Sequence, residues 1–66
     1  MRKYENTTDG RVYEVWQDWI DDAWICVYRG PQGGVNRTKR IEPCATEEEA
    51  QAALDAKAKR EKWVEV

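Results

Sequence analysis

The sequence predicts an α+β fold: an antiparallel β-meander with one C-terminal helix packed on one face, followed by a closing strand. Three observations predict it. Residues 24–29 (WICVYR) are rich in aromatic and β-branched side chains, as strands are, and end in the turn sequence GPQGG at residues 30–34. Residues 35–41 can pair back on them as a second, basic strand. From about Thr46 to Lys59 the chain has the start signal and apolar spacing of a helix.

Two further strands are expected before this hairpin. Residues 2–5 are short enough for an edge strand, and residues 6–10 (NTTDG) have the composition of a turn. Residues 11–17 (RVYEVWQ) are expected to form a strand, although apolar and polar side chains alternate only weakly along them. Residues 18–22 (DWIDD) are expected to turn the chain into the central strand, so the meander is predicted to end near residue 41.

The helix is predicted by its ends and by its apolar stripe. Thr46 and Glu49 have the spacing of a capping box, and residues 47–49 place three glutamates at the positive end of the helix dipole. The residues that recur at helical spacing are Ala50, Ala53, Leu54, Lys57 and Ala58. Because most of this stripe is alanine, the helix should lie close to the sheet. Residues 63–66 (WVEV) then alternate as the closing strand.

Which face of the sheet the helix covers is left open. Strand side chains alternate, so Trp24, Cys26 and Tyr28 share one face of the central strand. In one arrangement the core consists of Ile25, Val27, Tyr13, Val15 and Leu54. The open face then carries Trp16, Trp24 and Tyr28, as a stacking platform or a protein interface. In the other arrangement this tryptophan side is the core.

Size and charge bound the class of protein. Sixty-six residues make one domain, 1–66, near the lower limit for an independent core. The net charge of -2 argues against a generic polyanion binder, and the mixed charged residues, 36% of the chain, are typical of a solvated surface. No run approaches 18 apolar residues and residues 1–5 lack a signal-peptide core, so the expected location is cytoplasmic.

The sequence predicts that the chain is not an enzyme and that it binds no cofactor or metal. Without histidine, no nucleophile–base pair can be assembled, and Cys26 and Cys44 lack the spacing of a zinc site. Both cysteines are expected to stay reduced and to behave as small buried hydrophobes. The carboxylates at residues 18–22 and 47–49 are explained by turn solvation and helix capping. The glycine-rich turn joins two strands and lacks the Gly-Lys-Ser/Thr ending of a phosphate-binding loop.

The basic hairpin is the main candidate for a binding surface. The candidate cations, in a chain that is acidic overall, are Arg29, Arg37, Lys39 and Arg40. Arg37 and Lys39 are expected to share a strand face, from which they would contact phosphates. The alternative is an edge strand protected by charge against aggregation.

In their order along the chain, these segments resemble a WGR domain. The likeness rests on YEV at residues 13–15, Arg29 with Gly34 five residues later, the helix start TEEEA, the lysine-rich helix end and the ending WVEV. WGR domains are small sheet-plus-helix modules, found in poly(ADP-ribose) polymerases, where they bind DNA ends, and as short bacterial proteins. The signature arginine falls on Arg29, whereas Val27 and Tyr28 stand where the family has Trp and Gly. A weaker likeness, to the arm-type DNA-binding domains of phage integrases, rests on the three strands and the helix start.

The function predicted first is therefore a small nucleic-acid-binding module, with DNA favoured over RNA. Its cations would be those of the basic hairpin, with Tyr28 or Trp24 stacking on bases. The acidic turn, with Asp18, Asp21 and Asp22, is then expected to lie away from the basic strand, with the basic end of the molecule at the glycine turn. The alternative is a small acidic interaction protein, for instance a phage-type inhibitor, that binds a protein partner through aromatic and carboxylate side chains.

Overall fold

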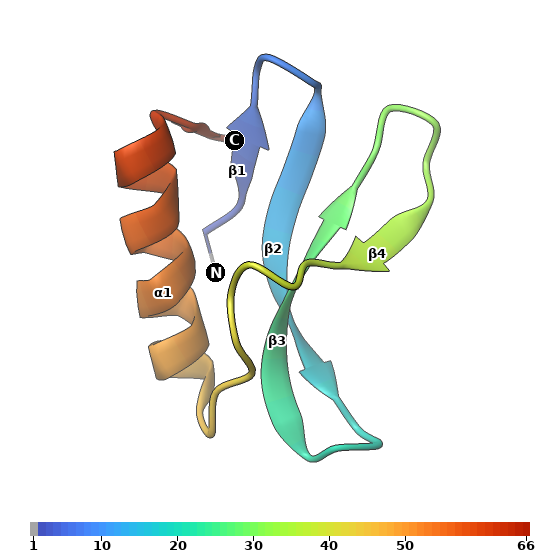
Figure 1. Ribbon diagram of the computed structural model, residues 1–66, viewed down its shortest axis with the longest axis vertical. Coiled ribbons are helices and arrows are strands. Elements are labelled where there is room, and N and C mark those ends of the chain that lie inside the picture. Colours follow the sequence, from blue (N-terminus) through green and yellow to red (C-terminus); the bar gives the residue numbers. More distant parts are fainter. Residues whose placement is uncertain (1) are drawn as a thin grey trace.

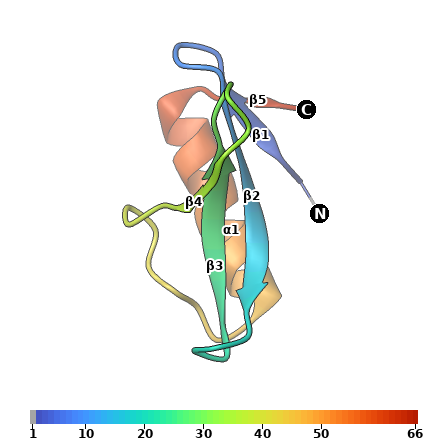
Figure 2. The ribbon, with the colours of Figure 1, turned by 90° about the vertical axis from the view of Figure 1, so that its right-hand side faces the viewer.

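The computed structural model describes residues 2–66 and confirms the α+β fold (Figure 1). The strands are β1 (Tyr4–Asn6), β2 (Arg11–Asp18), β3 (Ala23–Arg29), β4 (Val35–Arg37) and β5 (Val64–Glu65), and the helix is α1 (Glu47–Glu61). They form one open antiparallel sheet in the order β4-β3-β2-β1-β5. The helix covers one face of this sheet, and Figure 2 shows the sheet from the other side with α1 behind it.

Two predicted strands differ from the observed ones. β1 is not an edge strand, because the closing strand pairs with it through Tyr4↔Glu65 and Glu5↔Val64. The basic strand ends at Arg37 instead of residue 41. The Thr38 amide still donates to the Cys26 carbonyl at 3.0 Å, but the Thr38 hydroxyl then accepts from the Arg40 amide at 3.3 Å and bends the chain away from β3.

The pairing register between β2 and β3 decides which side chains form the core. Tyr13 lies opposite Tyr28 and Val15 opposite Cys26, and directly opposed residues share a face. The core cluster that results is Tyr13, Val15, Cys26, Ala50 and Leu54, with Trp24 and Tyr28 packed against it. Both predicted arrangements are therefore wrong in part. The first grouped Ile25 and Val27 with the β2 core residues, and the second placed Trp16 in the core, although all three lie on the uncovered face.

The helix begins and packs as the sequence indicates. The Glu49 amide donates to the Thr46 hydroxyl at 3.1 Å, and that hydroxyl donates to Glu49 Oε1 at 3.1 Å. Lys62, in the left-handed conformation at φ 61°, ends the helix and returns its amide to the last turn. Ala50, Leu54 and Ala58 are at most 1% exposed, so the alanine stripe does bring the helix backbone close to the sheet.

A polar cluster ties the start of β1 to the middle of α1. Asp55 accepts from Arg2 Nε at 3.0 Å, from the Tyr4 hydroxyl at 2.6 Å and from Gln51 Nε2 at 2.9 Å. These donors, Arg2 foremost, lower the pKa of Asp55 to about 2 although partial burial opposes them. The cluster thus fixes one end of the sheet to the helix, and it was not predicted from the sequence.

Both thiols are free, but they differ in burial. Cys26 is fully buried, and this burial raises the pKa of its thiol to about 12. Cys44 is half-buried and packs against the core from the segment before the helix. Within residues 2–66, the structure has no helix with the length and apolar character needed to span a membrane. The same residues contain no group of three or more carboxylates and thiols arranged to hold a metal ion.

We expect Leu54→Ala to lower the free energy of unfolding by about 2–5 kcal/mol, because this fully buried side chain joins the helix to β2 and β3. Ala56→Ser, on the exposed side of the same helix, is the control and should change it by at most about 0.5 kcal/mol. Chemical denaturation of the two variants measures both values. Equal stabilities would contradict the observed packing.

The Asp55 cluster predicts a defined pH dependence of stability. Because the pKa of Asp55 is lower in the folded chain (about 2) than its ordinary value of 3.8, its contribution is fully present above about pH 4 and is lost as the pH falls toward 2. Asp55→Asn should therefore be less stable than the parent chain at pH 6 and approach it at low pH. Thermal melts of both proteins across this range test the prediction, and a pH-independent difference would contradict it.

Candidate nucleic-acid interface

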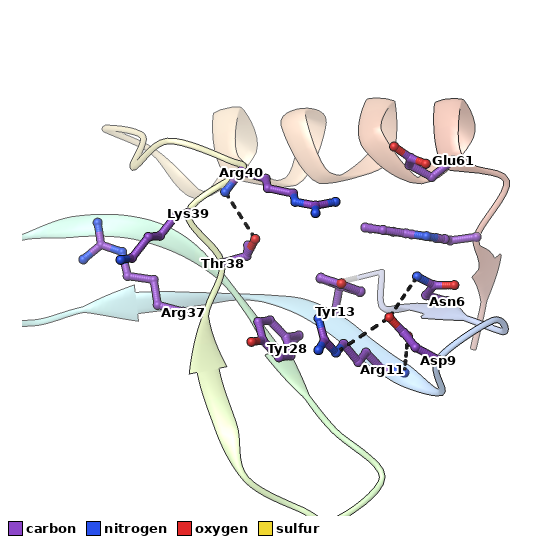
Figure 3. A pocket seen from close by; sticks show the side chains of 11 residues that line it. Asn6, Asp9, Arg11, Tyr13, Tyr28, Arg37, Thr38, Lys39, Arg40 and Glu61 are labelled. Carbon is purple, nitrogen blue, oxygen red and sulfur yellow. Dashed lines mark hydrogen bonds and ion pairs between the residues drawn. The ribbon is translucent and has the colours of Figure 1, made fainter.

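A hollow of about 370 Å³ lies between the β1–β2 turn, the end of α1 and the segment after β4 (Figure 3). We name it the basic groove. Its aromatic residues are Tyr13, Tyr28 and Trp63, and its cations are Arg11, Arg37, Lys39 and Arg40. Asp9 and Glu61 are its only acidic residues among those described. Four of the six residues predicted for nucleic-acid binding, Tyr28, Arg37, Lys39 and Arg40, line this groove.

Stacked aromatic rings form the floor of the basic groove. Tyr13 and Trp63 stack with ring centroids 4.1 Å apart and planes 11° apart. Tyr28, directly opposite Tyr13 in the register, lies 5.6 Å from it at a tilt of 44°. The helix end positions Trp63, because the Trp63 amide donates to the Ala58 carbonyl at 2.9 Å and returns the chain toward the sheet. Tyr13 is buried, whereas Trp63 and Tyr28 are half-buried and keep part of their surface in the groove.

Two arginines approach this floor from opposite sides. The Arg11 guanidinium lies 4.7 Å from the centre of the Tyr28 ring, a cation–π distance. Arg40 reaches over Tyr13 from the segment after β4 (Figure 3). Burial raises the pKa of Tyr13, and the positive charges of Arg11 and Arg40 oppose that rise. The centre of the groove therefore combines aromatic surface with two guanidinium groups.

The acidic residues of the groove are held by partners of their own. Asp9 accepts from the Arg11 amide at 3.0 Å and pairs with the Arg11 guanidinium at 3.7 Å. Lys57 donates to Glu61 at 2.9 Å and lowers the pKa of Glu61. Within residues 2–66, neither Lys39 nor Arg40 has a carboxylate within 4.0 Å of its charged nitrogens. Their charges remain available to an anionic ligand.

Arg37 and Lys39 stand at the margin of the groove, where they point away from Tyr13 and Tyr28 (Figure 3). Arg37 instead reaches the acidic turn, with its Nη1 3.5 Å from Asp18 Oδ2 and 3.8 Å from Asp21 Oδ2. The predicted separation of acidic turn and basic strand is therefore wrong. Asp18 and Arg37 occupy the same face of the sheet, and the long arginine side chain spans the distance between them.

The other two predicted residues lie elsewhere. Trp24 packs against the core, and its backbone pairs with Cys44 through two hydrogen bonds of 2.9 Å. Arg29 is exposed at the end of β3, on the face opposite Tyr28. Conversely, three residues that line the groove were not predicted from the sequence: Arg11, Tyr13 and Trp63. Only the strand register and the helix-end geometry bring these three together, so no local sequence signal identified them.

Comparisons with protein-family models, with curated proteins and with solved structures find no match to this chain. The resemblance to WGR domains accordingly stays a prediction.

The exposed ion pair of Arg37 should contribute little to stability. Its side chain is 42% exposed, and surface pairs of this kind are worth about 0–1 kcal/mol. We expect Arg37→Ala to keep the unfolding free energy within about 1 kcal/mol of the parent value, as measured by urea denaturation. A larger loss would show that the acidic turn needs this arginine in order to fold.

Proposed function

We propose that this chain is a small, non-catalytic nucleic-acid-binding module of the WGR-like type that holds its ligand in the basic groove. One observation carries the proposal: cationic side chains from two segments of the chain, Arg11 at the start of β2 and those of residues 37–40, lie beside or at the margin of an aromatic floor. Phosphate groups favour such cations, and exposed ring surface stacks with nucleobases. An anion without an aromatic part would contact the cations but would leave the aromatic floor unused.

The distribution of charge supports this choice of ligand. The chain as a whole is acidic, with a net charge of -2, yet the groove gathers four cations and only two carboxylates. Both carboxylates have cationic neighbours, so the uncompensated charge is positive. Such a local field attracts a polyanion to one surface while the rest of the molecule repels it. This arrangement favours a defined contact of a few phosphates over diffuse binding.

We infer different roles for the groove residues from their contacts. Arg40 and Lys39 would contact phosphate, since their charges are free within the described part of the chain. Arg11 is engaged with Asp9 and Tyr28 and would position the Tyr28 ring as well as contribute charge. Trp63 and Tyr28 would stack on a base. Arg37 is paired with Asp18 and Asp21, so it could contact phosphate only after breaking these ion pairs. We therefore expect it to contribute less to binding than the sequence suggested.

The decisive experiment compares two double charge reversals. Lys39→Glu with Arg40→Glu should raise the dissociation constant for labelled DNA at least about tenfold and lower the salt slope by about one for each lost phosphate contact. Lys59→Glu with Arg60→Glu changes the net charge equally at the exposed end of α1, outside the groove, and should retain more of the affinity.

Fluorescence anisotropy over a salt series, with single-stranded DNA, duplex DNA and RNA as probes, measures both effects. DNA is expected to bind more tightly than RNA. Equal losses in both double variants would show that only net charge matters and would contradict a groove. An absence of binding to all three probes at low salt would remove the proposed function.

A protein-binding function is the second candidate, and a different observation favours it. Trp19 and Ile20, in the acidic turn between β2 and β3, are 80% and 94% exposed. Exposed large aromatic and apolar side chains are typical anchors of protein interfaces. Binding through such anchors should depend far less on salt than phosphate binding does. Trp19→Ala should abolish this binding, whereas it should leave nucleic-acid binding unchanged.

A further inference from the structure

The uncovered face of the sheet carries apolar side chains from four of the five strands. The pairing register places on this face Val12, Trp16, Ile25, Val27, Val35 and Val64. Three of them are large exposed side chains: Trp16 at 40%, Val35 at 38% and Val64 at 52% exposure. Trp19 and Ile20, in the β2–β3 turn at one end of the sheet, are 80% and 94% exposed. Val27 is only 3% exposed, so the exposed apolar area of this face comes mainly from Trp16, Val35 and Val64. Large apolar side chains gathered on one face of a protein can mark an interaction site.

The charges on this face make it compatible with a second copy of itself. Lys3 pairs with Glu14 at 3.3 Å and Arg37 with Asp18 at 3.5 Å, so the central charges are compensated within each copy. The two ends of the face differ in charge. The end at the β2–β3 turn carries Asp22, and the opposite end carries Arg29. Neither residue has an ion-pair partner within residues 2–66. Glu5 lies two strands away from Arg29 at that same end.

These end charges select one of two symmetric arrangements. When two identical faces stack, the twofold axis lies in the plane between them. An axis parallel to the strands would bring the two acidic turns together, where like charges repel. An axis across the strands would instead place each acidic turn, with Trp19 and Ile20, over the Arg29 end of the other copy. Opposite charges then meet at both ends of the interface.

We propose that the uncovered sheet face is the interface of a twofold-symmetric homodimer in which the strands of the two copies run in opposite directions. The unlike charges at the two ends of this face, Asp22 and Arg29, support a second copy as the partner. Tyr13, Tyr28 and Trp63 pack on the opposite side, so both basic grooves stay open and the proposal does not depend on their ligand.

Sedimentation equilibrium of the nuclease-treated chain over a range of concentrations tests the dimer. We expect a monomer–dimer equilibrium that shows no larger species, because a twofold interface is closed. Trp16→Glu should raise the dissociation constant at least about tenfold, because it replaces the largest exposed apolar side chain of the strands with a carboxylate. Ala56→Glu, on the exposed surface of the helix behind the sheet, adds the same charge and should leave the equilibrium unchanged.

A charge exchange tests the orientation of the two copies. Asp22→Lys and Arg29→Asp should each weaken the dimer, because each creates two like-charged contacts. The double variant restores opposite charges at both ends and should recover most of the affinity. Asp22 has a φ of 51°, so lysine there is strained, but this strain is equal in the single and double variants and leaves the comparison valid.

Three results would overturn the proposal. A chain that stays monomeric up to about 1 mM has no such dimer, and its apolar face would then serve a foreign protein. Equal weakening by Trp16→Glu and Ala56→Glu would place the interface elsewhere. A double charge variant no better than the single ones would reject the antiparallel arrangement. Circular dichroism melts of every variant separate loss of association from loss of folding.

Discussion

The pairing of β2 with β3 is the constraint on which the rest of this structure depends. Seven residue pairs join the two strands, and their register places Tyr13, Val15, Cys26 and Tyr28 on one face. A shift of one residue would move every side chain of one strand to the other face. The helix would then meet Val27 and Ile25 in place of Cys26, and Tyr28 would leave Tyr13. The core, the floor of the basic groove and the composition of the uncovered face all follow from this one register.

Close approach of the helix is the second requirement. Ala50 and Ala58 flank Leu54, and these small side chains let the helix backbone lie near the two central strands. Because the helix is close, its left-handed end at Lys62 returns Trp63 onto the Tyr13 ring. The polar cluster around Asp55 holds the other side of the helix to β1. In so short a chain, the same contacts therefore stabilise the fold and build the candidate site.

The two faces of the sheet have different chemistry because only one is covered. On the helix side, aromatic rings meet the cations of the basic groove, which suits an anionic ligand with planar bases. On the uncovered side, apolar residues lie among ion pairs that are already satisfied, which suits a flat protein surface. This division lets the proposed nucleic-acid binding and the proposed dimer coexist, since Arg37 is the one cation of the groove that also lies on the uncovered face among the described residues.

The sequence by itself determined the order of the elements, the limits of the helix to within two residues and the site of the glycine turn. These features are local: capping at Thr46, the alanine spacing and the turn propensity of residues 30–34 act within a few residues of the chain. It also identified the cations Lys39 and Arg40 of the groove, because they stand together in one segment. Only the tertiary structure decided the face of Trp16 and Ile25, the pairing of Arg37 with the acidic turn and the meeting of Arg11, Tyr13 and Trp63. Strand register and helix-end geometry set these contacts between residues far apart in the chain, and weak alternation along β2 and β3 does not specify a register.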